Sequence, residues 1–296
     1  MVRRSDERRR TPGPEPFWAD AWEIDFAGQV PSGGPAIGGF VRLTLLPNQG
    51  VAWWWTSLLT PRLIAVRDHE VPLPRAGLEV RADGLWGELV CETPLEHWSI
   101  GLEAFGLAYD DLADAWGDEW GERLPVGLDL EWEVAPELGA IPERIADGGE
   151  SATDRPPSMP AGPSPGAPGV GYAHPGRIHG EILVGNDRIA FAGTGFRSRA
   201  SGVLDWWSDG PHRRLAWVAP TGAGPVVTGA AAHTAAVVLG QVPVLVTAAD
   251  RPAVRLARAL CRVDGPGSGA SGLGWAEWFP ATGPELPAFL TNDTRS

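Results

Sequence analysis

Much of what would assign a function directly is scarce or missing from this sequence of 296 residues. Cysteine occurs only as Cys91 and Cys261, one in each half, so there is no disulfide framework and no thiolate cluster for a metal. None of the six histidines has metal-ligand spacing to a carboxylate or thiol partner. Glycine-rich stretches such as residues 193–202 lack the ending of a phosphate-binding loop. The sequence therefore predicts neither a metal nor a cofactor.

Long apolar runs are missing as well. No stretch approaches the roughly 18 consecutive apolar residues of a membrane span. No apolar segment follows the basic N-terminus, as a secretory signal would require. The net charge is −13, whereas nucleic-acid binding needs clustered cationic side chains, so no nucleic-acid partner is expected. We expect a cytoplasmic protein without a membrane span, and nothing in the sequence indicates its oligomeric state.

The basic residues that do cluster lie at the N-terminus, in MVRRSDERRR, where arginines surround Asp6 and Glu7. This run and the TPGPEP that follows it contain almost nothing that a core would bury. Residues 1–16 are therefore predicted to form a disordered, solvated tail.

Tryptophan is the residue present in excess, with 15 copies against only 2 tyrosines. Its side chain buries a large apolar area and carries one hydrogen-bond donor. Such an excess suits two arrangements, a barrel interior that must be filled or a pocket walled for a large apolar ligand. Both alternatives stay open on the sequence alone.

Short alternating runs separated by turn residues predict an all-β fold. Residues 40–47 and 51–59 flank Asn48-Gln49-Gly50 and read as a hairpin, in which Trp54 faces one side and Trp53 and Trp55 the other. Residues 128–134 alternate most regularly, with the leucines, Trp132 and Val134 facing inward. Residues 110–120 are the one helix candidate in the first half, and residues 254–264 are assigned to a strand.

Residues 139–169 interrupt this pattern, because they are rich in proline and glycine and poor in apolar side chains. Such a composition cannot repay its ordering entropy by burial and indicates a linker. We therefore predict two antiparallel β units, each a barrel or sandwich domain, joined by this linker. The full division is a tail (1–16), an N-terminal domain (17–138), the linker (139–169), a C-terminal domain (170–280) and a second tail (281–296).

The densest cluster of glycine, charge and tryptophan is GFRSRASGVLDWW, residues 195–207. It resembles the pattern Gly-x-Arg-Asp-His-Ser-Trp-Gly-x-Arg-Asp-Trp of a two-barrel, lipocalin-like family. That family includes hydroxyneurosporene synthase (carotenoid 1,2-hydratase) and many bacterial proteins. The anchors Gly195, Arg197, Gly202, Asp205 and Trp206 are kept. The other motif positions are changed, to Ser198, Arg199, Ala200, Ser201 and Leu204. The resemblance extends over most of residues 17–279 and implies the two-barrel architecture.

Two roles are open for the retained charges Arg197 and Asp205. They can form a buried ion pair that fixes geometry. Alternatively, Asp205 is desolvated beside Trp206 and Trp207, its pKa is raised, and it serves as a general acid towards an alkene or carbonyl. The related hydratase adds water across an isoprenoid double bond, a reaction that needs an acid and a dry pocket, and both roles stay open on the sequence.

A second cluster, ETPLEHW at residues 92–98, brings Glu92 and His97 close in sequence and is a candidate acid–base pair or a solvated turn. With Asp205 and Arg197, these two complete the candidate catalytic set. The candidate ligand-binding residues are Trp53, Trp55, Trp98, Trp206 and Trp207. The sequence thus predicts a hydratase-, isomerase- or cyclase-like protein acting on an isoprenoid- or polyketide-like hydrophobic small molecule. The alternative is a non-catalytic carrier of such a ligand.

Overall fold

The computed structural model describes residues 2–29, 34–111, 114–116, 121–138, 170–203, 213–218, 226–228, 236–246, 254–264 and 271–278. Within them the regular structure is β-strand, apart from short 3-10 turns, which confirms the predicted all-β class. The strands are β1 (Trp18–Gln29), β2 (Ala36–Leu46), β3 (Val51–Leu59), β4 (Leu63–Pro72), β5 (Glu79–Ala82), β6 (Leu85–Thr93), β7 (His97–Tyr109), β8 (Glu122–Val134), β9 (Val170–Val184), β10 (Asp187–Val203), β11 (Arg213–Val218), β12 (Val226–Thr228), β13 (Ala236–Val246), β14 (Val254–Asp264) and β15 (Ser271–Trp278). The 3-10 turns are η1 (Arg4–Glu7), η2 (Pro47–Gln49), η3 (Asp114–Trp116) and η4 (Pro136–Leu138).

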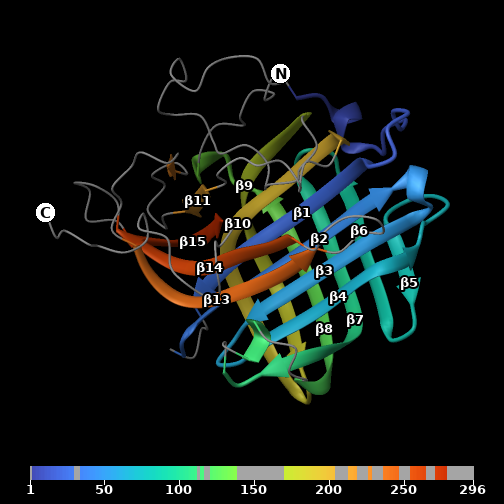
Figure 1. The fold of residues 1–296 in the computed structure, drawn as a ribbon. Helices are drawn as coiled ribbons and strands as arrows, with labels where there is room; N and C mark the ends of the chain where they lie inside the picture. The colour runs from blue at the N-terminus through green and yellow to red at the C-terminus, as the bar shows by residue number, and fades with distance from the viewer. Residues whose placement is uncertain are drawn as a thin grey trace, which may run out of the picture.

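Ten strands form one antiparallel sheet in the order β4-β3-β2-β1-β10-β9-β8-β7-β6-β5, and β4 also pairs with β7. That additional pairing, Leu63 with Tyr109 through Ala65 with Leu107, closes the strands from β4 round to β7 into a barrel (Figure 1). The hairpin β5–β6 continues the sheet beyond β7, outside the closed barrel. Paired strands of this sheet are successive in the sequence except at two places, where β1 pairs with β10 and β4 pairs with β7. This is the up-and-down barrel arrangement found in lipocalins.

The barrel interior follows from the alternation of the strands. On β8, Leu128, Leu130 and Trp132 are buried, while Asp129 and Glu133 are exposed. The β2–β3 hairpin also forms as expected, with Trp54 in the interior cluster and Trp53 and Trp55 in a cluster on the outer face. The tryptophan excess therefore serves two cores, because the sheet is buried on both sides.

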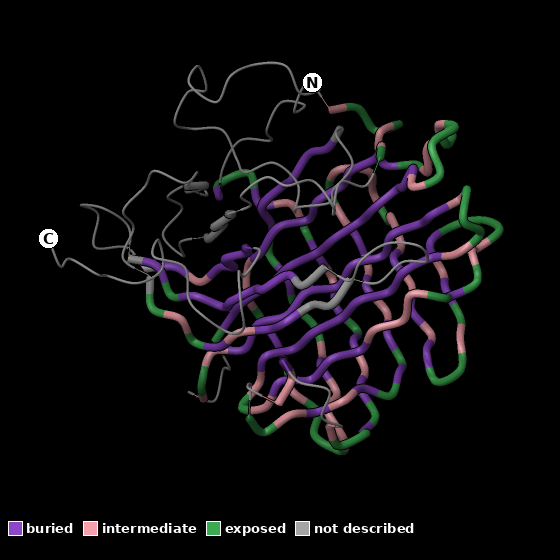
Figure 2. Tube along the Cα trace, in the orientation of Figure 1, coloured by how far each residue is buried: buried purple, intermediate pink, exposed green. Residues whose placement is uncertain are grey.

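The second core lies between the barrel wall and a five-stranded sheet, β12-β11-β15-β14-β13. Leu260 and Trp275 of this sheet pack with Phe40 of the barrel. In Figure 2 the barrel strands beneath β13–β15 are largely buried, whereas the hairpin ends on the far side are exposed. The segment at residues 254–264 is strand β14, as predicted.

A buried charge network also joins the two sheets. Arg258 of β14 contacts Glu23 of β1 at 2.6 Å and Glu277 of β15 at 3.0 Å, and Arg42 of β2 contacts the same Glu23 at 3.3 Å. All four side chains are nearly fully buried. Each charge therefore depends on its partners for compensation.

Three sequence predictions have different outcomes in the structure. Residues 1–16 are not a disordered tail, because residues 2–16 lie on the protein, with the turn η1 and a buried Glu7. The division into two domains at 139–169 remains a prediction, and the ten-stranded sheet runs across it, since β9 and β10 pair with β8 and β1. Of the helix candidate at residues 110–120, the described part contains only the 3-10 turn η3.

Candidate functional site

The predicted motif begins on β10, whose alternation sends Arg197 and Arg199 into the barrel. Arg197 lies opposite Ile24 of β1, and Arg199 lies opposite Trp22, and both of these apolar partners belong to the interior cluster. Both arginines are 1% exposed. Two cations thus enter an otherwise apolar interior, where each needs a partner that compensates its charge.

The partner of Arg197 comes from the N-terminal segment, residues 2–16. The two terminal nitrogens of Arg197 donate to the Glu7 carboxylate oxygens at 2.8 and 2.6 Å, which is a bidentate pair. Glu7 itself is 4% exposed. A residue predicted to be solvated is therefore a buried counter-ion, and the N-terminal segment covers one end of the barrel, its mouth.

Aromatic rings surround the same guanidinium. Its carbon lies 5.0 Å from the ring centre of Trp132, 5.1 Å from that of Trp98 and 5.5 Å from that of Tyr172. These distances lie within the range of cation–π attraction. The ring of His174, next to Tyr172 on β9, is 3.5 Å from Arg197 through Nδ1. Desolvation and the charge of Arg197 lower the pKa of His174 to about 3, so this imidazole is neutral.

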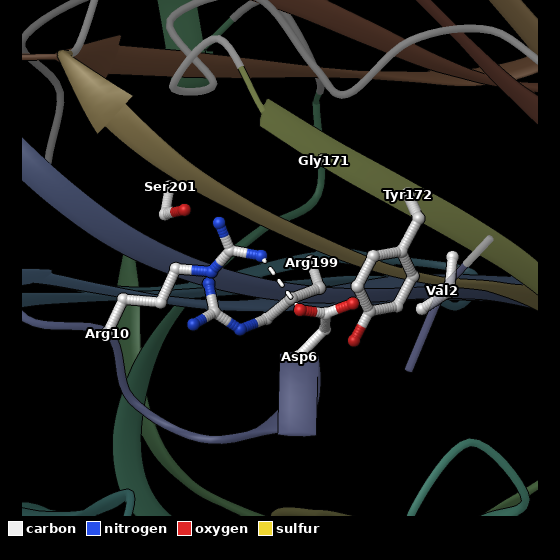
Figure 3. A pocket seen from close by; sticks show the side chains of 7 residues that line it. All are labelled: Val2, Asp6, Arg10, Gly171, Tyr172, Arg199 and Ser201. Atoms are coloured by element: carbon white, nitrogen blue, oxygen red, sulfur yellow. Dashed lines mark hydrogen bonds and ion pairs between the residues drawn. The ribbon is translucent and has the colours of Figure 1, made fainter. Parts of the chain in front are cut away.

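Arg199 has a parallel arrangement. It lies over the indole of Trp22 at 3.8 Å and pairs with Asp20 of β1 at 2.5 Å. Asp20 also accepts a hydrogen bond from the backbone N–H of Arg10 at 2.9 Å. Burial raises the pKa of Asp20 even though the Arg199 charge opposes that rise. Figure 3 shows this corner, where Asp6, on η1, and Arg10 approach Arg199 and Tyr172 around a small enclosed cavity of about 10 Å³.

An open groove of about 920 Å³ adjoins this cluster at the barrel mouth, and we call it the mouth groove. Trp22 and Trp98, whose rings lie against the two arginines, also line the groove. Its wall is largely apolar and comes from Leu78, Leu89 and neighbouring residues of β6. Its volume lies in the range of about 300–1,000 Å³ that is typical of small-molecule sites.

Several buried polar atoms of this region have no hydrogen-bond partner among the described residues. They include the indole nitrogens of Trp22, Trp98 and Trp132 and Nε2 of His174. Most buried polar groups in proteins are paired, and a polar group of a molecule bound in the groove would supply partners for these atoms. Three of these four residues were not singled out as ligand-binding by the sequence.

Residues 3–234 match the model of a family described as a domain of unknown function, DUF7064. The chain belongs to this family. The match covers the whole barrel, β1 to β10, and stops before β13. A candidate AttH protein of Nitrosomonas europaea, known from a crystal structure, has 11% identity and a TM-score of 0.47, over 90% of this chain and 94% of that one. No curated protein matches the chain in sequence.

The residues predicted for the site do not all lie together in the structure. Arg197 and Trp98 meet at the mouth, as described above. Asp205, Trp206 and Trp207 lie outside the described residues, so the predicted pairing of Asp205 with Arg197 stays a prediction. In the described part, Glu7 is the carboxylate that pairs with Arg197.

His97 lies on the outer face of the barrel wall, since the next residue, Trp98, faces inward. Glu92 lies on the same outer face, because its carboxylate contacts Ser99 there. His97 Nε2 is 2.6 Å from Glu131 of β8, and Ser99 donates hydrogen bonds to both Glu92 and Glu131. The side chains of His97 and Glu131 are 36% and 35% exposed. The two predicted catalytic residues thus share a surface cluster, which the barrel wall separates from Arg197.

Trp53 and Trp55 stack at 5.8 Å in the core between the barrel and the second sheet, away from the mouth groove. The Trp55 indole donates to His69 Nε2 at 2.7 Å. Their surroundings are packed side chains of both sheets. The role that the structure gives these two tryptophans is to join the sheets.

Sequence reasoning missed Glu7, Trp22, Tyr172 and His174. The last two carried a usable signal, because they alternate with glycine and proline in GYAHPG and share a face with Ile178 of the interior cluster. Glu7 carried none, since its partner is 190 residues away. In the described ranges, no group of three or more His, Cys, Asp or Glu side chains is arranged to hold a metal ion. None of the helices found there is long and apolar enough to cross a membrane.

Proposed function

We propose that the protein binds a hydrophobic small molecule in the mouth groove. The observation that carries this proposal is the groove itself, with an apolar wall from β6 and two tryptophans, Trp22 and Trp98, whose indole nitrogens have no partner among the described residues. An apolar ligand would gain about 25 cal/mol for each Å² of apolar surface removed from water. The unpaired indole donors would orient any oxygen that it carries.

Binding can be tested with geranylgeraniol, a neutral isoprenoid alcohol, by tryptophan fluorescence and calorimetry. Cys91 lines the groove and lies opposite the inward-facing Trp98, so Cys91→Phe should fill part of the groove and weaken binding by about tenfold or more. The matched control is Val203→Phe, because Val203 is 45% exposed and does not line the groove. Absence of binding to the unmodified protein, or equal loss in both variants, would contradict the proposal.

A second candidate function is hydration or isomerisation of the bound molecule, as the resemblance to carotenoid 1,2-hydratase implies. The observation that favours it is that two indole side chains, Trp22 and Trp98, line the groove, because an electron-rich ring system can stabilise a carbocation. In this proposal, Asp205 delivers a proton to one alkene carbon, water adds to the other, and a proton returns to the carboxylate. Asp205→Asn should then abolish alcohol formation from an isoprenoid alkene while leaving binding unchanged. Turnover that survives this change would exclude Asp205 as the acid.

A further inference from the structure

The rim of the mouth groove is strongly cationic in an otherwise acidic protein. Four arginines line the groove, namely Arg4, Arg8 and Arg9 from the N-terminal segment and Arg75 from the β4–β5 connection. The acidic residues that line it are Glu88 and Glu7, and Glu7 is already bound by Arg197. The whole chain has a net charge of −13 and contains no lysine, so every basic side chain is an arginine.

These arginines are available to an incoming anion. Arg8 and Arg75 are exposed, and among the described residues no carboxylate pairs with either of them. Arg9 donates to the backbone carbonyl of Pro74 at 2.8 Å, which holds the N-terminal segment beside the loop that carries Arg75. Arg4 lies 3.5 Å from Glu96, and both side chains are more than half exposed, so this pair is weak. The rim thus carries uncompensated positive charge from both the N-terminal segment and the β4–β5 connection.

An apolar wall and a cationic rim together define the ligand's chemistry. The wall continues from the rim through Leu78 and Leu89 to Trp98 at the floor. Arginine binds carboxylates through two parallel N–H donors, which a compact ammonium group cannot reproduce. Building on the proposed function, we propose that the ligand is an amphipathic anion, a long-chain carboxylate with its head group at Arg8, Arg9 and Arg75 and its tail in the groove.

The proposal predicts that binding affinity depends on the charge of the head group when the hydrocarbon chain stays the same. Oleate, oleyl alcohol and oleylamine share one chain and differ in charge, and each is titrated below its critical micelle concentration by calorimetry. Oleate should bind at least about fivefold more tightly than oleyl alcohol, and oleylamine most weakly. Only the oleate affinity should fall steeply as salt rises, since the screening length shortens from about 10 Å at 0.1 M to about 3 Å at 1 M.

The residues are tested by the double substitution Arg8→Gln with Arg75→Gln. Oleate affinity should fall at least about fivefold, whereas oleyl alcohol affinity should change less than twofold. The control is Arg81→Gln with Arg188→Gln, which removes the same charge from two exposed arginines that do not line the groove. Equal affinity for oleate and oleyl alcohol, or the same loss in the control, would overturn the carboxylate assignment. If oleyl alcohol and geranylgeraniol still bind, the groove remains a hydrophobic site, so the two proposals fail separately.

Discussion

His174 and His69 show how burial sets the charge state of single residues in this protein. His174 touches Arg197 inside the barrel mouth, and His69 accepts a hydrogen bond from Trp55 beside the second sheet. Desolvation, with the charge of Arg67 adding to it, lowers the pKa of His69 to about 4. Both imidazoles are therefore neutral in the folded protein at pH 7.

A pH dependence of stability follows. In the unfolded chain, both histidines titrate near pH 6.5, so between pH 6.5 and 4 the unfolded state binds protons that the folded state does not. The free energy of unfolding should thus fall as the pH decreases through this window, by about 1 kcal/mol per pH unit for each group. His69→Gln, whose amide oxygen can still accept from Trp55, should reduce this slope in urea unfolding at pH 7.5, 6 and 5. The exposed His179→Gln should keep the wild-type slope, and an unchanged slope in His69→Gln would rule out this explanation.

At the scale of elements, the seam between β1 and β10 joins the first strand of the barrel to its last. Eleven residue pairs cross it, from Trp18 with Val203 to Gly28 with Gly193. A Cβ on Gly195 would overlap the backbone carbonyl oxygen of Asp25, so the two strands can approach only if this position has no side chain. The glycine retained from the family pattern therefore has a structural role.

Gly195→Ala should accordingly push strands β1 and β10 apart. We expect a loss of about 2 kcal/mol or more in the free energy of unfolding, because the obstacle is backbone and cannot rotate away. Gly101→Ala is the matched control, since the nearest atoms there belong to the partly exposed Trp86 ring, which can move. Similar losses in both variants, measured by denaturant unfolding, would show that the seam has no special requirement.

The sequence predicted the elements more fully than their partners. Alternation placed Trp53, Trp54 and Trp55 on the correct faces, because the side-chain period of a strand is a local property. The β1–β10 seam and the Glu7–Arg197 pair join residues more than 150 positions apart, and no local pattern encodes such a contact. The N-terminal segment was misassigned for a related reason. Its composition is that of a tail, and only the buried cation of β10 makes Glu7 a core residue.

On the scale of the whole molecule, the charge network around Arg258 couples the barrel to the second sheet. Arg258→Ala would leave Glu23 and Glu277 buried without this counter-ion, which should cost about 3–5 kcal/mol in the free energy of unfolding. Arg188→Ala, which breaks an exposed pair with Glu181, should change stability by less than about 1 kcal/mol.

Combining Arg258→Met with Glu277→Gln should recover much of that loss, because Glu277 then carries no charge and Glu23 keeps its ion pair with Arg42. Chemical unfolding of the four proteins measures these differences. If Arg258→Ala were as stable as wild type, the two sheets would not depend on this network for their association.

The pairing of the first strand with the tenth has a consequence for how the protein is made. Translation delivers about 5–20 residues per second, so β1 emerges roughly 10 s or more before β10, which ends at Val203. Throughout that interval one edge of β1 has no partner strand, and an unpaired edge can template aggregation. Arg197, the counter-ion that Glu7 requires, arrives equally late. The newborn chain therefore passes through a stage in which β1 has an unpaired edge and Glu7 has no counter-ion, and pairing with β10 ends both conditions at once.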